Sequence, residues 1–416
     1  WNSRGVLTVK GSAKGVLSAT KFPVTDIKFS INEGQLMNER KRVELGQLDL
    51  SGQLTNNGKP TIEDLELKLD VHKFKTKKSA LSGSLHVPGF GTPHTKFTLK
   101  GHLYLDDLNA LFGDLDIRQG KLQMNTEGTL KWDENLQNFN YHRSGFYGDI
   151  ELTGFDLKSG DYQLNDIEAS GRLKGRDWNN ASVSGKIQGS EFDYKGSLKE
   201  WTSGVFEKGS KRALITGDLV VKEFNLNEFL IDPDPVETAV KVAPKVYNGE
   251  KLLDIGWDAN LKLTAEKFRY DEMDFNHISA RVQLREDRIV VPELFLKAME
   301  GTAKIKTSFR QEQDRVTWSG NFYLDKIRID EFFRQFENFG QNEITNEHLS
   351  GLLTTESDLY MQFDHQWNVL TKDLVLLAKL NVRNGELKGY KPLESLSSFV
   401  EVDDLRHIRF SELKNV

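Results

Sequence analysis

The stretch LAKLNVRNGELKGYKPLESLSSFVEVDDLRHIRFSELKNV, residues 377–416, shows the pattern that decides the fold. Apolar residues at 378, 380 and 382 alternate with polar residues at 379, 381 and 383. A period of two is that of a β-strand with one apolar and one polar face. Asn384-Gly385 follows, and this dipeptide predicts a turn. A half-buried strand is therefore predicted before residue 384.

Helical spacing appears after this predicted turn. Beyond Gly389 and Pro392, apolar residues recur at the spacing of a short amphipathic helix, namely Leu393, Leu396, Phe399 and Val400. This helix is expected to pack on the last strands, or else to cap a groove or touch a membrane. A second apolar series at 405, 408, 410 and 413 precedes residue 416, where we expect the next strand to begin.

The rest of the chain repeats the same alternation between turn signals. Leu7 and Val9 alternate with polar neighbours, and so do Ile27, Phe29 and Ile31 until Glu33-Gly34 is expected to break the run. Further alternating stretches lie at 43–54, 64–71, 80–87 and 95–105. Helical spacing is confined to short pieces at 107–112, 228–231 and 331–336. The sequence therefore predicts an all-β fold of antiparallel strands with a few short helices.

An internal repeat supports one elongated architecture. Segments starting at Gly101, Gly217 and Gly320 each hold a glycine, an alternating strand and an apolar helical turn, at intervals of about one hundred residues. Residues 148–175 also align with residues 258–287. Duplication of a module with continuity between copies is typical of repetitive sheets rather than of separate globular domains.

One segment differs in composition. Residues 231–257 contain Pro233, Pro235 and Pro244 and lack alternation until their end, which predicts an exposed linker or loop. We therefore expect N-terminal β repeats at 1–230, this linker at 231–257, and a C-terminal β module at 258–416 that is incomplete at its end.

Composition argues against several classes of function. The chain has 56 basic and 62 acidic residues, a net charge of −6, so binding to nucleic acid through phosphate neutralisation is not expected. It contains no cysteine, which excludes disulfides and thiolate metal ligands within these residues. Apolar runs fall far short of the ~20 residues that span a bilayer. The chain begins at Trp1, and we expect a preceding segment to have been cleaved or left out.

The sequence contains no recognised catalytic motif. Nine histidines are present, among them His72, His86, His94, His102 and His277, and none has a known metal-ligand spacing, so surface or strand positions are the favoured interpretation. Acidic pairs such as Asp106-Asp107 and Asp403-Asp404 fall at predicted element ends, where capping is the usual role. We therefore predict a protein that is not an enzyme and has no cofactor or metal.

The apolar faces of so many strands need a cover. Each large buried side chain stabilises a fold by ~1.5–3 kcal/mol, so dozens cannot face water. A second sheet, closure into a barrel, or a bent sheet that holds an apolar guest would each provide that cover. The candidate residues lining such a face in the C-terminal module are Leu261, Leu263, Ile278, Val282, Ile305, Phe309, Trp318, Phe322 and Leu324.

Several of these patterns together resemble the AsmA-like family of bacterial envelope proteins. The resemblance covers about 258–416, with a weaker echo back to about residue 10. It is carried by the alternation at 261–270 and 278–284, the turns at 287–290 and 300–303, and the order of strand, Asn-Gly, Gly-Tyr, short helix and FSELKNV near the end. The linker also lies where the family tends to have a variable Pro- and Ala-rich segment.

The resemblance implies a function as well as a fold. AsmA-like proteins look like members of the repeating β-groove class, akin to bridge-like lipid-transfer proteins, in which a U-shaped, taco-like sheet shields acyl chains. We accordingly expect a bacterial periplasmic carrier or conduit for phospholipid between the inner and outer membranes. It would be anchored to the inner membrane by an N-terminal segment absent from this sequence. Expected partners are a phospholipid or other acyl lipid, a membrane surface and, as a further class, envelope proteins.

Two other functions stay open. A closed β-sandwich or solenoid would suit a structural or assembly factor for outer-membrane proteins that offers sheet edges to its clients. The third hypothesis is an enzyme that acts on glycans through scattered carboxylates. Bound lipid in the purified protein would distinguish the lipid carrier from these two hypotheses.

Overall fold

The computed structural model describes residues 2–18, 21–38, 43–91, 94–108, 116–132, 139–159, 162–206, 212–225, 227, 252–253, 256–270, 273–392, 395 and 407–415. Contacts between Cα atoms divide the chain into two compact units, unit 1 (Trp1–Thr216) and unit 2 (Gly217–Val416). The predicted linker at 231–257 lies largely outside the described residues, and Trp257 already begins a strand.

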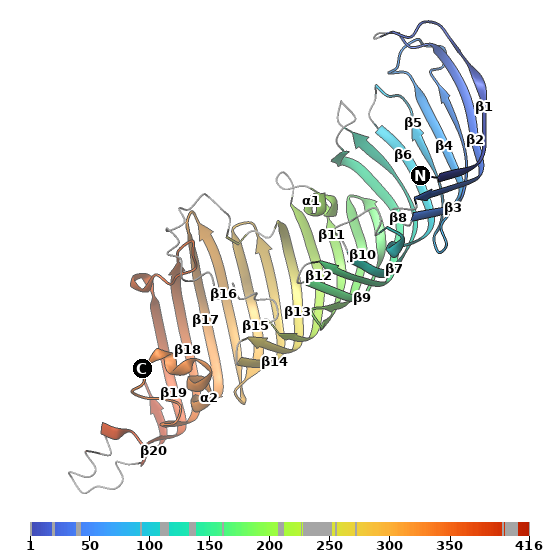
Figure 1. Cartoon of the computed structure of the whole chain (residues 1–416). Coiled ribbons are helices and arrows are strands. Elements are labelled where there is room, and N and C mark those ends of the chain that lie inside the picture. Colours follow the sequence, from blue (N-terminus) through green and yellow to red (C-terminus); the bar gives the residue numbers. More distant parts are fainter. Residues whose placement is uncertain are drawn as a thin grey trace, which may run out of the picture. The chain divides into compact units, whose positions relative to one another are not determined.

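Unit 1 is an antiparallel meander in which each strand from β1 to β11 pairs with its neighbours in sequence (Figure 1). Two short helices accompany the strands, η1 (Leu105–Leu108) and α1 (Trp201–Phe206). The strands are β1 (Asn2–Lys14), β2 (Val24–Asn38), β3 (Val43–Thr55), β4 (Glu66–Lys75), β5 (Ala80–Val87), β6 (His94–Tyr104), β7 (Asp116–Trp132), β8 (Phe139–Ser159), β9 (Tyr162–Gly175), β10 (Asp177–Ile187) and β11 (Ser190–Lys199), and β12 (Ala213–Asn225) begins here and continues into unit 2.

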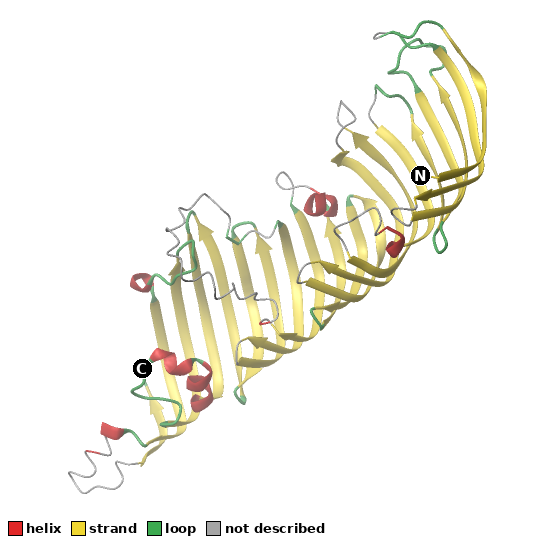
Figure 2. Ribbon diagram, in the orientation of Figure 1, coloured by secondary structure: helices red, strands yellow, loops and turns green. Residues whose placement is uncertain are grey.

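Unit 2 repeats this arrangement from β13 to β20, again with antiparallel pairing between consecutive strands. Its described helices include α2 (Ile329–Gln335), η4 (Glu337–Gly340) and η5 (Thr371–Asp373). The strands are β13 (Trp257–Tyr270), β14 (Met273–Arg285), β15 (Arg288–Ala298), β16 (Gly301–Glu312), β17 (Arg315–Arg328), β18 (Leu349–Phe363), β19 (Val375–Lys388) and β20 (His407–Lys414). Figure 2 shows how strongly strand dominates both units, and the predicted all-β, antiparallel fold class is confirmed.

The short helices predicted from the sequence have different outcomes. The prediction at 331–336 is confirmed by α2. Of the piece at 107–112, only 107 and 108 are described, within η1. The piece at 228–231 lies outside the described residues, and of the piece at 393–400 only residue 395 is described, in helical conformation.

Two predicted breaks are wrong, because the structure places a bulge at each of them. Asn384-Gly385 lies inside β19, with Asn384 at φ 50° and Gly385 paired with Phe410. Glu33-Gly34 lies inside β2, where Glu33 has φ 53° and the register with β3 shifts. Both dipeptides supply the left-handed residue that a bulge needs as readily as a turn. The expectation that the next strand begins only at residue 416 is also wrong, since β20 (His407–Lys414) already pairs with β19.

Bulges in neighbouring strands lie beside one another and bend the sheet. A Cβ on Gly5 of β1 would lie 2.8 Å from the Cα of Gly34 in the β2 bulge. In β7 a Cβ on Gly120 would lie 3.2 Å from the Cα of Phe155, next to a register shift in β8. In unit 2, β15 carries a bulge at Pro292, which has no N–H to offer the ladder. Because a bulge bends its strand, adjacent bulges bend neighbouring strands together.

Glycines on the apolar face lie beneath aromatic rings of the neighbouring strand. Phe29 pairs with Gly52, and a Cβ on Gly52 would lie 2.4 Å from Cζ of that ring. Phe97 pairs with Gly128 in the same way, at 2.7 Å from its Cε1. The glycine leaves room for the ring to lie across the strand.

We expect Gly52→Ala to lower the free energy of unfolding by about 1–3 kcal/mol, because the added methyl displaces the Phe29 ring from its seat. Gly46→Ala, also in β3, is the control, since its nearest neighbour would lie at 3.6 Å. Denaturant midpoints measure both changes. Equal effects of the two substitutions would contradict the ring-over-glycine explanation.

The polar face of unit 1 contains one strongly shifted carboxyl group. Glu66 accepts hydrogen bonds from Lys68 Nζ at 2.9 Å and from Asn57 Nδ2 at 3.2 Å, and its Oε1 lies 2.6 Å from Nε2 of His86. These partners, Lys68 foremost, lower the pKa of Glu66 from 4.5 to about 2, against a smaller opposing effect of burial.

A carboxyl group whose pKa is lowered by folding stabilises the native state above its unfolded pKa, and loses that contribution as the pH falls through its folded pKa. We therefore expect Glu66→Gln to destabilise the protein at pH 6, with a deficit that shrinks between about pH 4.5 and pH 2. Urea unfolding across this range tests it. Glu63→Gln, at an exposed residue, should show a smaller dependence, and a deficit independent of pH at Glu66 would refute the linkage.

Candidate functional site

The register of unit 2 builds one continuous apolar face. Residues directly opposite each other in antiparallel strands point to the same side of the sheet. One cross-strand row runs over β13 to β17 as Leu263, Ala280, Leu294, Ile305 and Phe322. A second row runs over β14 to β18 as Leu284, Ile289, Phe309, Trp318 and Met361.

The remaining predicted lining residues join this face through the same pairings. Leu261 pairs with Val282, Ile278 pairs with Ala265, and Leu324 pairs with Ala303. Each lies an even number of residues from a member of a row on its own strand, so its side chain points the same way. The structure thus brings all nine predicted residues onto one face of unit 2; their contact with a ligand stays a prediction.

This face is only partly covered. Ile278 is 7% exposed, and the other eight predicted residues are all partly exposed. The short side chains of this face are buried, with Ala265, Ala280 and Ala303 at 5%, 5% and 3% exposed, but most of its long side chains are not. A closed two-layer core would bury both kinds. In the described part of the unit, the strands make their packing contacts with sequence neighbours and with short helices.

The face is covered at one end by α2. This helix packs against β17 and β18, where Ile327, Leu353 and Val382 are in register. These three side chains are 2%, 4% and 8% exposed. Farther along the same strands, Phe322 and Trp318 are partly exposed. Burial is therefore complete beneath the helix and partial at Phe322 and Trp318, and it is complete again at Val316, which is 0% exposed at the opposite end of β17.

Three aromatic rings form a shelf on the open part of the face. Phe309 stacks on Trp318 with ring centroids 5.4 Å apart and planes 8° apart. Trp318 meets Phe322 edge to face at 6.1 Å. Its indole Nε1 donates to Oγ1 of Thr307 at 2.6 Å, so the one polar atom of the shelf is satisfied within the sheet.

The opposite face of unit 2 is polar and charged. Lys304, Tyr323, Glu356 and Lys379 form an exposed row in register. On the β12 and β13 strands Lys267 Nζ lies 2.9 Å from Glu223 Oε1. This hydrogen-bonded ion pair lowers the pKa of Glu223 and raises the pKa of Lys267. Such a surface is a solvated exterior.

Unit 1 shows the same two-faced construction. Ile27, Leu54, Leu67 and Val87 form a row in register across β2 to β5, and all four are partly exposed. After β11, helix α1 contributes Trp201, whose ring centroid lies 5.9 Å from that of Phe146. The ring centroid of Phe146 in turn lies 6.0 Å from that of Phe97.

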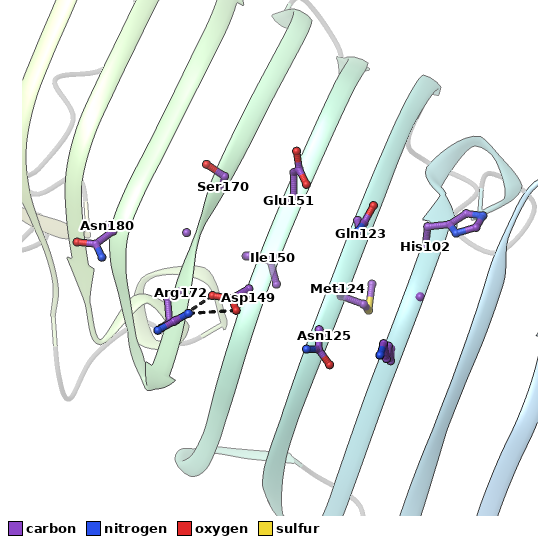
Figure 3. Close-up of a pocket in the computed structure, with 13 residues that line it drawn as sticks. His102, Gln123, Met124, Asn125, Asp149, Ile150, Glu151, Ser170, Arg172 and Asn180 are labelled. Atoms are coloured by element: carbon purple, nitrogen blue, oxygen red, sulfur yellow. Dashed lines mark hydrogen bonds and ion pairs between the residues drawn. The ribbon is translucent and has the colours of Figure 1, made fainter.

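A polar hollow of about 630 Å³ also lies in unit 1 (Figure 3). Two cross-strand rows border it, Lys100, Asn125, Asp149 and Arg172 in one and His102, Gln123, Glu151 and Ser170 in the other. Arg172 Nε lies 2.8 Å from Asp149 Oδ1, and this hydrogen bond lowers the pKa of the Asp149 carboxyl. This hollow is not predictable from the sequence alone, because polar alternation is visible within each strand but the register that aligns four strands is not.

The histidines are distributed among separate contacts. His72 Nε2 lies 2.8 Å from Ser51 Oγ, and His102 Nε2 lies 3.1 Å from the Lys78 carbonyl. Burial lowers the pKa of His94, with smaller effects of nearby cations. His277 has φ 50° next to a register shift in β14. Among the described residues, no cluster of three or more histidine, aspartate and glutamate side chains has the geometry of a metal site.

Comparison with known proteins does not place the chain in a family. No family model, no curated protein and no solved structure matches the sequence or the fold. Within the described residues, none of the helices has the length and apolar character required to cross a bilayer.

Ile305 distinguishes an open face from a closed core. If water or a displaceable ligand covers it, we expect Ile305→Asp to lower stability by no more than ~1–2 kcal/mol, because the carboxylate stays hydrated. The same carboxylate in a dry core would cost several kcal/mol and prevent folding. Lys304→Asp, on the opposite face of β16, is the control. Urea midpoints give the answer, and an Ile305→Asp protein that cannot fold would count against the open face.

Proposed function

We propose that this protein is a carrier or conduit for lipids that holds acyl chains against the apolar face of its sheet. The observation that carries this proposal is the continuous apolar face of unit 2. It is in register over β13 to β18, and most of its large side chains are incompletely buried. An acyl chain laid there would complete the burial that the protein's own residues leave incomplete.

The chemistry of a lipid fits both faces. Acyl chains lack hydrogen-bonding groups, and the aromatic shelf offers them apolar surface whose one polar atom is already bonded to Thr307. A lipid headgroup would stay in water at the rim of the sheet. Holding and releasing a chain requires neither a nucleophile nor a metal, so the proposed activity is not enzymatic.

The proposed setting follows from the resemblance to AsmA-like envelope proteins. It comprises the bacterial periplasm, an inner-membrane anchor outside this sequence, and phospholipid as the cargo between the two membranes. The resemblance is carried by the strand pattern at 258–416, and the antiparallel order and apolar face of unit 2 agree with that pattern.

A second candidate function is supported by the edge of unit 1. β1 pairs only with β2 among the described strands of the unit, and each of its residues is exposed. Val6, Leu7 and Val9 are 58%, 65% and 57% exposed. A long bare edge offers its backbone N–H and C=O groups to another strand, which suits an assembly factor that pairs with client proteins.

Bound lipid decides between the two. We expect the protein purified from membranes in a gentle detergent to carry phospholipid, observed as added mass in native mass spectrometry and identified after solvent extraction. We expect Ile305→Asp to lose most of this lipid and Lys304→Asp to retain it, since only the first alters the apolar face. Lipid-free protein that binds unfolded β-strand peptides would favour the assembly factor.

A further inference from the structure

Unit 2 exposes a group of phenylalanine rings that the proposed lining does not include. The phenylalanine cluster consists of Phe332, Phe333, Phe336 and Phe339, on α2 and the following turn η4. Phe332 lies 4.9 Å from Phe336, and Phe333 meets Phe339 edge to face at 5.2 Å. The outer two rings, Phe336 and Phe339, stack in parallel at 5.7 Å and 2°.

The outer pair faces solvent. Phe336 is 41% exposed and Phe339 is 54% exposed, although the inner rings pack on them. Isolated apolar residues are common on protein surfaces, but paired rings supported by two further rings form a contiguous patch. Such a patch suits contact with another apolar surface.

The backbone holds this pair in place at a conformational cost. Glu337, Asn338 and Phe339 have φ values of 49°, 53° and 57°, and Gly340 follows at 68°. Consecutive left-handed residues that carry a Cβ are disfavoured, so the surrounding contacts must impose them. Asn338 Oδ1 accepts a hydrogen bond from the Asn346 N–H at 2.7 Å, and the Phe339 N–H donates to the Phe336 carbonyl at 2.8 Å. These bonds fix Phe339 over Phe336.

The cluster borders the apolar face. The helix that carries it packs against β17 and β18 and lies beside β18 in Figure 1. Beneath this end of the sheet are the buried residues Ile327 and Leu353. A surface that touches the outer rings therefore adjoins the place where the proposed lining ends.

Charge around the rings narrows the choice of partner. Residues 328–340 contain three carboxylates, Asp330, Glu331 and Glu337, and two cations, Arg328 and Arg334. Glu331 is paired with Arg334 at 2.7 Å, and Asp330 is paired with Arg328. Among the described residues, Glu337 has no ion pair with a basic side chain. The cluster therefore carries one uncompensated negative charge, which disfavours an anionic surface and has little effect on contact with a zwitterionic one.

We infer that the stacked Phe336–Phe339 pair is the site at which unit 2 contacts the surface of a zwitterionic lipid bilayer. The two rings enter the boundary between headgroups and acyl chains, and the carboxylates remain in water. We assign this contact a role in passing lipid between a bilayer and the apolar face, and that role rests on the proposed function. The contact itself does not.

Vesicle binding tests the inference. We expect the wild-type chain to co-sediment with phosphatidylcholine vesicles and the double variant Phe336→Ala/Phe339→Ala to bind at least tenfold more weakly. Replacing a third of the lipid by phosphatidylglycerol should weaken wild-type binding. Tyr360→Ala is the matched control, since Tyr360 is 40% exposed but lies on the polar face of β18. The control should bind as the wild type does.

A labelled protein provides a second readout that does not remove the rings. Because the sequence contains no cysteine, Glu337→Cys accepts one environment-sensitive fluorophore beside the cluster. Vesicles should shift its emission to the blue, and the same dye at Lys379→Cys on the polar face should not respond. This measurement stands even where the double variant fails to fold.

The outcomes separate this inference from the proposed function. A double variant that keeps its bound lipid but loses vesicle binding supports the inference. A wild-type chain that carries lipid but ignores zwitterionic vesicles, or prefers anionic ones, overturns it and leaves the carrier function standing. An unresponsive label at Glu337→Cys also overturns it, and the cluster is then a docking site for a protein. Vesicle binding without any carried lipid keeps the contact and contradicts the carrier.

Discussion

Pairing between consecutive strands is the constraint on which the rest of this structure depends. A meander satisfies the backbone hydrogen bonds of every interior strand, but it provides nothing to cover either face of the sheet. The polar face needs no cover, because its lysines and carboxylates are hydrated. The apolar face does, and the described helices cover only its margin, as at Ile327 and Leu353 beneath α2. The exposure of Ile305 and Phe322 follows directly from this topology.

Alternation in the sequence was sufficient to predict the fold class and which residues share a face. Both depend on a period of two within a single strand, and Ala303, Ile305 and Phe309 show that period without reference to any partner. Helical spacing over four or more residues was equally informative, as α2 shows. These features are local, so one sequence contains them.

Features that depend on the neighbouring strand were not predictable in the same way. The sequence predicts a turn at Asn384-Gly385 and a strand break at Glu33-Gly34, yet a left-handed residue followed by glycine is compatible with a turn or a bulge equally well. The choice depends on whether the chain continues to pair, as Gly385 does beneath Phe410. The polar hollow beside Arg172 and Asp149 has the same origin, since it exists only where four strands align. Register is a property of pairs of strands and leaves little trace in either one alone.

The rings that lie over Gly52 and Gly128 have a consequence for anything that rests on the apolar face of unit 1. At these two positions the ring fills the gap left by the glycine, so the surface there has shallower relief than where side chains project from every strand. An acyl chain on such a surface finds similar contacts at successive positions, and the barrier between one position and the next is correspondingly low. Such a surface would have little selectivity for shape, because a surface of shallow relief cannot distinguish acyl chains by the position of a kink. The same packing that stabilises the bent sheet would therefore favour translation along it over tight, specific retention.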